Sequence, residues 1–173
     1  QGKEANLIVE GAEIEMDRAA LDALAEPLVH LVRNAIDHGL ETTDERLAVG
    51  KPVAGTLRLS ASPKWDKVVI EISDDGRGMD PADIAAHAIK QGIVSAEVVA
   101  QMTQDDVLTL ICHPRFSLKQ EVTNISGRGI GMDAVKHQVE RLRGSLKIAT
   151  QPGKGTTFRL EVPIKLSLLS VVL

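Results

Sequence analysis

Polar side chains recur at helical spacing between residues 28 and 39. His30, Asn34 and His38 lie four apart, with Asp37 beside the last of them, so they share one face of a helix. Imidazole, amide and carboxylate groups can bind phosphates, and the Asn34 oxygen suits Mg²⁺, which favours oxygen ligands. Taken alone, such a face is more often the solvated side of an amphipathic helix.

Three glycine-rich segments follow along the chain. Residues 74–78 (DDGRG) come directly after an alternating stretch, where a carboxylate can accept a hydrogen bond from an exocyclic amine such as adenine N6. Residues 127–131 (GRGIG) run into a helical pattern, whose free N–H groups and dipole favour an anion. Residues 153–157 (GKGTT) lie between two strand patterns. Each segment alone is weak evidence, because plain turns have the same composition.

Two common nucleotide-binding motifs are excluded. The Gly-Lys pairs at 50–51 and 153–154 lack the upstream glycine of a P-loop. Gly127-x-Gly129 continues to Met132 where a Rossmann fingerprint needs glycine. A nucleotide site in this chain must therefore be of another kind.

The first third of the chain is predicted to hold two short strands and two helices. The strands are expected at 6–10 and 13–16, around Gly11. Asp17 is a plausible N-cap for a helix to about residue 25, and Pro27 suits the first turn of a second helix that Gly39 closes. The second helix positions the polar face.

The rest of the chain is predicted to contain two hairpins and several helices. Strands at 56–62 and 67–73 form the first hairpin. Helical spacing follows in three pieces over 81–112, split at 92–95 and near 103, and again at 132–142. Strands at 145–150 and 156–163 close the chain. The pattern favours an α/β fold in which helices cover one face of a mixed, mainly antiparallel sheet, a two-layer sandwich.

Bulk composition favours one folded domain in 173 residues, with 43% hydrophobic and 25% charged residues. A net charge of −4 gives no basic field for nucleic acid. The single Cys112 fits a reducing compartment, so we expect a cytoplasmic protein. No apolar run is long enough for a membrane span. Both ends of the sequence look like cuts within a longer protein.

The joint order of these segments resembles the four nucleotide-binding boxes of the GHKL superfamily, which includes histidine kinases, DNA gyrase, MutL and a heat-shock chaperone. Residues 28–41 (LVHLVRNAIDHGLE) and 126–136 (SGRGIGMDAVK) are closely similar to the CheA family of chemotaxis histidine kinases. The likeness extends through residues 45–46 and 50–52 to 162–163. It therefore covers nearly the whole chain.

This resemblance implies a role for each motif residue. Asp74 would bind the adenine amine, Gly76 and Gly78 would let the loop approach the base, and Thr156 would support the pocket. Asn34 would hold Mg²⁺, with His30 and His38 close to the phosphates. The implied catalytic residues are His30, Asn34 and Arg128. The implied cofactor-binding residues are Asn34, Asp37, His38, Asp74, Gly76, Gly78, Met79, Gly127, Arg128, Gly129, Gly131, Met132 and Thr156.

The resemblance also implies a domain layout. Residues 1–164 would be a single GHKL domain in which about 79–126 form a lid over ATP, and 165–173 would begin a regulatory domain. In the lid the family pattern Pro-Gly-Phe-Ser-Thr is replaced by Pro114-Arg115-Phe116-Ser117-Leu118. The control of lid closure is therefore expected to differ.

The implied function is transfer of the ATP γ-phosphate to a histidine on a separate phosphotransfer domain, and from there to a response regulator. Adaptor and receptor contacts would use domains outside this chain. A gyrase-like or MutL-like ATPase is disfavoured, because position 30 holds histidine where water activation needs a carboxylate. A module that senses nucleotide without transferring phosphate is the third hypothesis, supported by Arg115 and Leu118.

Overall fold

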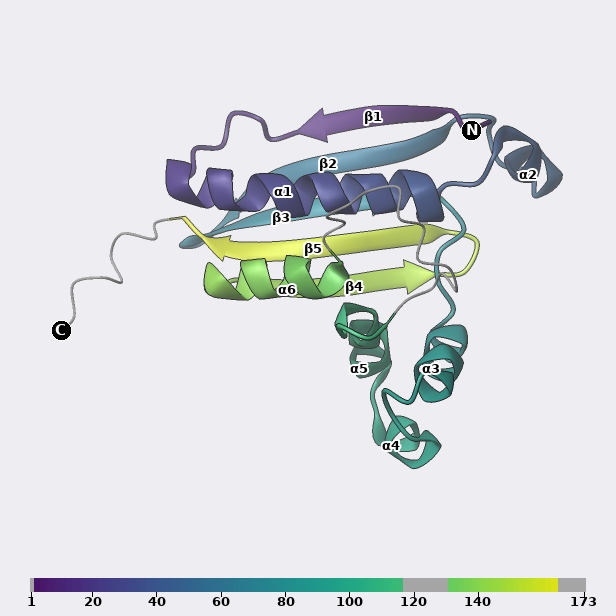
Figure 1. The fold of residues 1–173 in the computed structure, drawn as a ribbon. Coiled ribbons are helices and arrows are strands. Elements are labelled where there is room, and N and C mark those ends of the chain that lie inside the picture. The colour runs from purple at the N-terminus through teal and green to yellow at the C-terminus, as the bar shows by residue number, and fades with distance from the viewer. Residues whose placement is uncertain (1, 117–130, 165–173) are drawn as a thin grey trace.

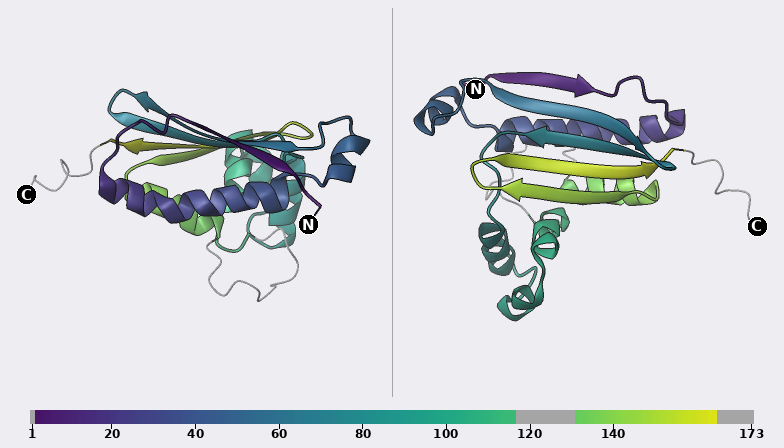
Figure 2. Two further views of the ribbon diagram at one scale, coloured as in Figure 1. Left: turned by 90° about the horizontal axis from the view of Figure 1, so that it is seen from above. Right: turned by 180° about the vertical axis from the view of Figure 1, so that it is seen from behind.

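The computed structural model describes residues 2–116 and 131–164. In this part of the chain one mixed sheet is covered on one face by helices α1 and α6, which confirms the predicted two-layer α/β sandwich (Figures 1 and 2). The strand order is β1-β2-β3-β5-β4, and the β1–β2 pair is parallel while the others are antiparallel. The strands are β1 (Ala5–Glu10), β2 (Gly55–Lys64), β3 (Lys67–Asp74), β4 (Ser145–Gln151) and β5 (Gly155–Pro163).

Alternating side chains place the core between the sheet and its helices. Phe158, Leu160 and Val162 of β5 are buried while the residues between them are partly exposed, as expected for a strand with one face on the core. Helix α6 (Met132–Arg141) contributes buried Val135 and Val139. The two predicted hairpins are confirmed, although β2 runs further than expected, through Pro63 to Lys64.

Two predictions for the N-terminal region are wrong, one for the residues before helix α1 (Arg18–Asn34) and one for the helix itself. Residues 13–16 are not a strand, because Gly11 turns the chain at φ +78° and Ile14 N–H bonds back to the Gly11 carbonyl. Asp17 does cap the helix, accepting from Ala19 N–H, but the helix does not break before Pro27. A proline inside a helix costs about 3 kcal/mol, and burial of Leu24 and Leu31 on the same helix offsets it.

Helix α1 ends in a wider turn that the sequence did not reveal. Residues Ala35–Gly39 form a short π-helix, η1, and Leu40 N–H bonds to the Ala35 carbonyl. Helix α2 (Thr43–Ala48) follows, and its capping box joins Thr42 and Glu45 in both directions. The Thr-x-x-Glu spacing could have predicted α2.

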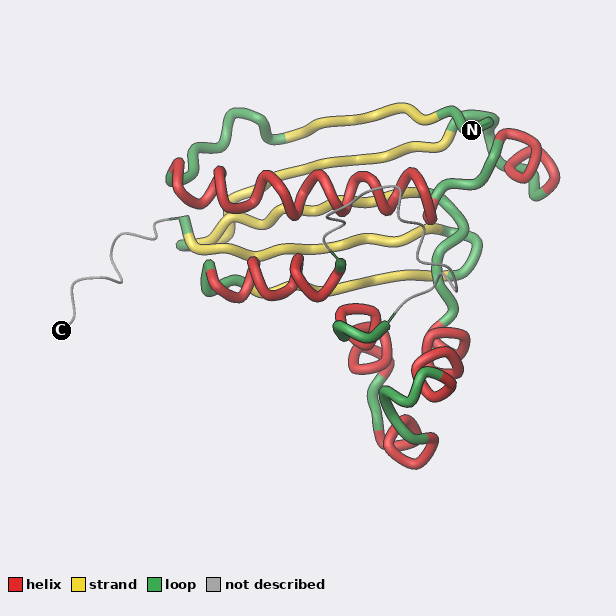
Figure 3. Tube along the Cα trace, viewed as in Figure 1, coloured by secondary structure: helices red, strands yellow, loops and turns green. Residues whose placement is uncertain are grey.

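Three short helices form an arm that projects beyond the edge of the sheet, as Figure 3 shows. They are α3 (Pro81–Lys90), α4 (Ala96–Gln101) and α5 (Gln104–Thr109), followed by the 3₁₀ turn η2 (Leu110–Cys112). The predicted division into three pieces is confirmed, and the predicted interruptions coincide with the N-caps Ser95 and Thr103. Among residues 2–116 and 131–164, no helix is long and apolar enough to cross a membrane.

Candidate nucleotide site

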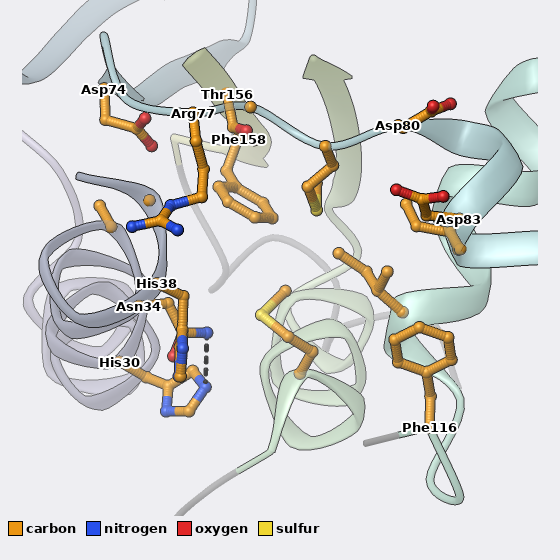
Figure 4. Close-up of a pocket in the computed structure, with 17 residues that line it drawn as sticks. His30, Asn34, His38, Asp74, Arg77, Asp80, Asp83, Phe116, Thr156 and Phe158 are labelled. Carbon is orange, nitrogen blue, oxygen red and sulfur yellow. Dashed lines mark hydrogen bonds between the residues drawn. The ribbon is translucent and has the colours of Figure 1, made fainter. Parts of the chain in front are cut away.

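A cavity of about 470 Å³ lies where the end of α1, the loop after β3 and the helical arm meet. Figure 4 shows Asp74 and Thr156 on one side, His30, Asn34 and His38 on a second, and Asp83 and Phe116 across from them. Residues far apart in the sequence are thus brought into one pocket. Its volume falls in the range of small-molecule sites.

Asp74 is the buried carboxylate of this pocket. It ends β3 opposite Thr156 of β5, is 8% exposed, and its Oδ1 accepts a hydrogen bond from Gly76 N–H at 2.9 Å. Burial raises the pKa of Asp74 above its ordinary value, although the backbone hydrogen bonds at Gly76 and Thr156 oppose the rise. A buried acceptor held in this way suits a ligand that brings its own N–H donor.

Threonine hydroxyls connect Asp74's neighbours to the next loop. The hydroxyls of Thr150 and Thr156 lie 2.9 Å apart, and Thr150 Oγ1 also accepts from Met79 N–H at 2.8 Å. The loop after β3 is therefore tied to the β4–β5 hairpin. Through the Thr150 hydroxyl, Thr156 is connected to Met79 in the loop that lines the pocket.

Two glycines of the first glycine segment are required by close backbone contacts. A Cβ on Gly76 would lie 2.0 Å from the Gly39 carbonyl oxygen, and one on Gly78 would lie 2.1 Å from the Gln151 carbonyl oxygen. Gly78 also has φ +67°, which other residues adopt at a cost. Glycine is thus required here by the approach of the loop to the protein's own backbone, while the predicted approach to a base stays a prediction.

The predicted polar helix face begins on α1 with His30 and Asn34 and continues into η1, which carries His38. Asn34 Nδ2 lies 3.1 Å from His30 Nε2 one turn earlier. Burial, together with the charges of Arg33 and His38, lowers the pKa of His30, against a weaker opposing effect of Asp133. A neutral imidazole accepts the Asn34 amide N–H, which leaves the Asn34 amide oxygen for another partner.

This donor set fits Mg²⁺ only as a site shared with a ligand. In residues 2–116 and 131–164, no three His, Cys, Asp or Glu side chains gather in a way that could hold a metal ion. Mg²⁺ commonly binds one or two protein oxygens together with substrate phosphates and water. The amide oxygen of Asn34 has the chemistry that such a shared site requires.

The predicted site residues divide into three groups. The cavity is lined by His30, Asn34, His38, Asp74, Gly78, Met79, Met132 and Thr156. Three others do not line it but adjoin residues that do, namely Asp37, Gly76 and Gly131. The predicted phosphate-loop residues Gly127, Arg128 and Gly129 lie outside the described residues, as does the lid segment beyond Phe116.

Sequence reasoning missed several residues of the pocket wall. Arg77, Asp80 and Asp83 bring charge to the cavity, and Phe116 and Phe158 bring aromatic surface. Asp80 could have been predicted as the N-cap before Pro81, and its Oδ1 accepts from Ala82 N–H. The aromatic residues carry no local pattern that points to a pocket.

A buried ion cluster beside the loop was also missed. Arg46 is fully buried and pairs with Glu41 at 2.9 Å and with Asp75 at 3.2 Å. Lys51 pairs with the other Glu41 oxygen at 2.6 Å. Burial alone would raise the pKa of Glu41, but its hydrogen bonds and the two cations hold it below the ordinary value. The carboxylate therefore stays ionised.

The fold and pocket together define an α/β sandwich with a cavity at the end of α1, one side of which is formed by the buried carboxylate of Asp74. The chain belongs to the family described as histidine kinase-, DNA gyrase B- and HSP90-like ATPases, whose model matches residues 21–166.

Similar proteins of known sequence narrow this class to the CheA type. The chain is 43% identical to the chemotaxis protein CheA of Halobacterium salinarum over 99% of its own length, and 41% identical to CheA of Salmonella typhimurium over 97%. The sensor histidine kinase CheAY of Helicobacter pylori is 40% identical over 99%. The chain spans only about a quarter of these relatives, 26%, 25% and 21% of their lengths.

Solved structures show the same fold at low identity. The catalytic domain of histidine kinase ThkA, in a nucleotide-free form, has a TM-score of 0.53 and 17% identity over 92% of this chain and 79% of that one. The histidine kinase domain of the blue-light activated kinase from Erythrobacter litoralis has a TM-score of 0.52 and 14% identity, over 91% and 54%.

Proposed function

We propose that this domain binds ATP with Mg²⁺ and transfers the γ-phosphate to a histidine on a separate phosphoacceptor domain, in chemotaxis-type signalling in the cytoplasm. One observation carries the proposal. A single cavity joins the buried carboxylate of Asp74 to the His30–Asn34 pair, so one end can recognise a base while the other holds phosphate.

The base end of the site is Asp74. Its buried carboxylate would accept a hydrogen bond from the exocyclic amine of adenine, and Gly76 and Gly78 add no side chain to the loop beside it. Thr156 would support the carboxylate through its strand pairing with Asp74. The aromatic and aliphatic wall formed by Phe158 and Met79 would cover the flat base.

The phosphate end is the polar face of α1. His30 accepts from the Asn34 amide N–H, so the Asn34 oxygen would be left to hold the cation that accompanies a triphosphate. His38 lines the same wall. Mg²⁺, when bound, would neutralise charge on the phosphates. We assign Gly127, Arg128, Gly129, Gly131 and Met132 to the phosphate loop from their sequence pattern and the N-terminus of α6, with Arg128 as the catalytic cation.

Transfer itself needs alignment more than covalent chemistry from this domain. A neutral acceptor imidazole attacks with its own ring nitrogen lone pair, forming the N–P bond as the bond from phosphorus to the departing ADP oxygen breaks. It needs no general base on this chain. The occupation of position 30 by a histidine that bonds to Asn34 disfavours the gyrase-like ATPase, which would activate water from that position.

The domain boundaries and partners belong to the same proposal. Residues 1–164 would form the domain, and the arm α3–η2 would belong to a lid over residues 79–126. Residues 165–173 would lead to a regulatory domain. The acceptor domain and a response regulator would be its signalling partners. Relatives four times as long have room for such domains.

Calorimetric titration of ADP and of ATP with Mg²⁺ tests the site first. We expect the native chain to bind both, Asp74→Asn to lose most of the affinity, and Asn34→Ala to lose the dependence on Mg²⁺. Incubation with labelled ATP and an acceptor domain of the same type then tests transfer. Binding without labelling of the acceptor would favour the nucleotide-sensing module, and absence of binding would overturn the proposal.

A further inference from the structure

The loop that carries Asp74 is held by two cations that do not line the pocket, the buried Arg46 and the partly buried Lys51. Lys51 Nζ donates to the carbonyl oxygens of Asp75 at 3.0 Å and Gly76 at 2.8 Å, and to Glu41 Oε2 at 2.6 Å. An ammonium group has three donors, so these three acceptors engage all of them. Arg46 adds a longer hydrogen bond to the same Asp75 carbonyl at 3.3 Å.

These contacts act on one particular peptide group. The Asp75 carbonyl and the Gly76 N–H belong to the same planar peptide, so fixing the oxygen also fixes the direction of the N–H. That N–H donates to Asp74 Oδ1 at 2.9 Å. Lys51 and the Asp74 carboxylate are therefore connected through a single rigid unit.

The surroundings leave this peptide little freedom. Asp75 is held on both sides, because its N–H bonds to the Thr56 carbonyl and its Oδ1 accepts from Thr56 N–H at 2.8 Å. Gly76 approaches Gly39 so closely that a Cβ would meet the Gly39 carbonyl oxygen at 2.0 Å. We call Lys51 and Arg46 together the clamp. Lys51 has a side chain that is 18% exposed, so it can be changed with less loss of packing than the buried Arg46.

We infer that Lys51 is a positioning residue for base recognition: it holds the Asp75–Gly76 peptide, orients the Asp74 carboxylate, and so sets how strongly the site prefers a purine that carries an exocyclic amine. The inference rests on the proposed nucleotide site and adds a specificity determinant to it. Lys51 touches no ligand in this role. Its effect reaches the base through Asp74 alone.

The test compares ADP with inosine diphosphate, which has an oxygen where adenine has the amine. A hydrogen bond to a charged group contributes about 1.5–3 kcal/mol. The native domain is therefore expected to bind ADP at least about tenfold more tightly than inosine diphosphate. In Lys51→Met we expect that ratio to fall by about tenfold, mainly through weaker ADP binding. Lys147→Met is the matched control, since Lys147 lies exposed on β4, and it should keep the native ratio.

The ratio separates positioning from a general loss of stability, because a merely destabilised fold would weaken both nucleotides together. Lys51→Arg, which keeps a cation with several donors, should restore most of the preference. Retention of the native ratio by Lys51→Met would overturn the positioning role and leave the nucleotide site standing. Failure of the native domain to bind either nucleotide would overturn the proposed function itself.

A measurement on the native protein covers the case in which Lys51→Met does not fold. The Gly76 amide should exchange its hydrogen slowly in the absence of nucleotide, because the clamp holds its hydrogen bond to Asp74 before any ligand arrives. Exchange at the rate of an open loop would overturn the inference.

Discussion

Asn34 donates its amide N–H to the imidazole of His30, with Nδ2 and Nε2 3.1 Å apart across one turn of α1. The bond needs an unprotonated Nε2, and burial lowers the pKa of His30 in support of that state. The orientation of the predicted metal ligand therefore depends on the protonation of its neighbour.

The first prediction concerns this histidine. Its folded-state pKa lies below 6.5, so the unfolded chain binds a proton first, and the stability that His30 contributes is present above pH 6.5 and lost as pH falls toward the folded-state value. NMR titration of the imidazole should give a midpoint below 6.5, with the resonance assigned by its absence from His30→Asn. A midpoint at or above 6.5 would contradict the neutral, accepting role.

Asp74→Asn should separate binding from stability. The pKa of Asp74 is raised in the folded state, so the stability that it contributes is fully present below the unfolded-state pKa and is lost as pH rises through the folded-state pKa. Replacement by the neutral amide is expected to weaken ADP binding about tenfold to a hundredfold while leaving the thermal midpoint unchanged or higher. Calorimetry and thermal unfolding on one preparation check both parts. A large drop in the midpoint would show that Asp74 serves the fold instead.

Gly78 and Gly153 form a matched pair of left-handed glycines, at φ +67° and +78°. A Cβ on Gly153 meets no atom within 4 Å, whereas one on Gly78 would clash with the Gln151 carbonyl. Gly153→Ala should therefore cost only the conformational strain, about 1–2 kcal/mol. Gly78→Ala should cost more and abolish nucleotide binding. Equal unfolding free energies from denaturant titration of the two variants would argue against the clash.

Arg46→Met is expected to destabilise the domain by about 3–5 kcal/mol, because it leaves buried Glu41 with one cation in place of two. Arg58→Ala is the control. Its pair with Glu10 is about half exposed, and exposed pairs contribute about 0–1 kcal/mol. Urea unfolding of both variants measures the difference. Comparable losses in the two would mean that burial of the cluster carries no special weight.

Much of the fold follows from hydrophobic periodicity and from the residues that begin and end helices and strands. The strands of both hairpins and the breaks at Ser95 and Thr103 were predicted because alternation and N-caps are local properties. The continuation of α1 through Pro27 was not predicted, because it depends on the burial of Leu24 and Leu31 in the core, which is a tertiary interaction. Local preference pointed to a break there and tertiary burial overrode it.

The site divides in the same way. Asp74, Asn34 and their glycines belong to short motifs whose order carried the resemblance, so their meeting in one cavity was predicted. Phe116 and Phe158 line it only because the arm and the sheet come together. Lys51 and Arg46 lie in segments that resemble the CheA family, but their hydrogen bonds to the Asp75 carbonyl depend on tertiary distances that sequence spacing does not reveal.

The crowding around Asp74 limits how this sequence can drift. Cβ atoms at Gly39, Gly76 and Gly155 would lie 2.9, 2.9 and 1.9 Å from atoms of that one residue. At Gly76 and Gly155 the nearest obstacles are main-chain oxygens, of Gly39 at 2.0 Å and of Asp74 at 1.9 Å, so no single further substitution could make room there. At Gly39 the obstacle is the Asp74 carboxylate itself, which a larger side chain would have to displace. In a library of random variants, these positions should stay glycine wherever ADP binding is selected, and accept alanine or serine only among clones that have lost it.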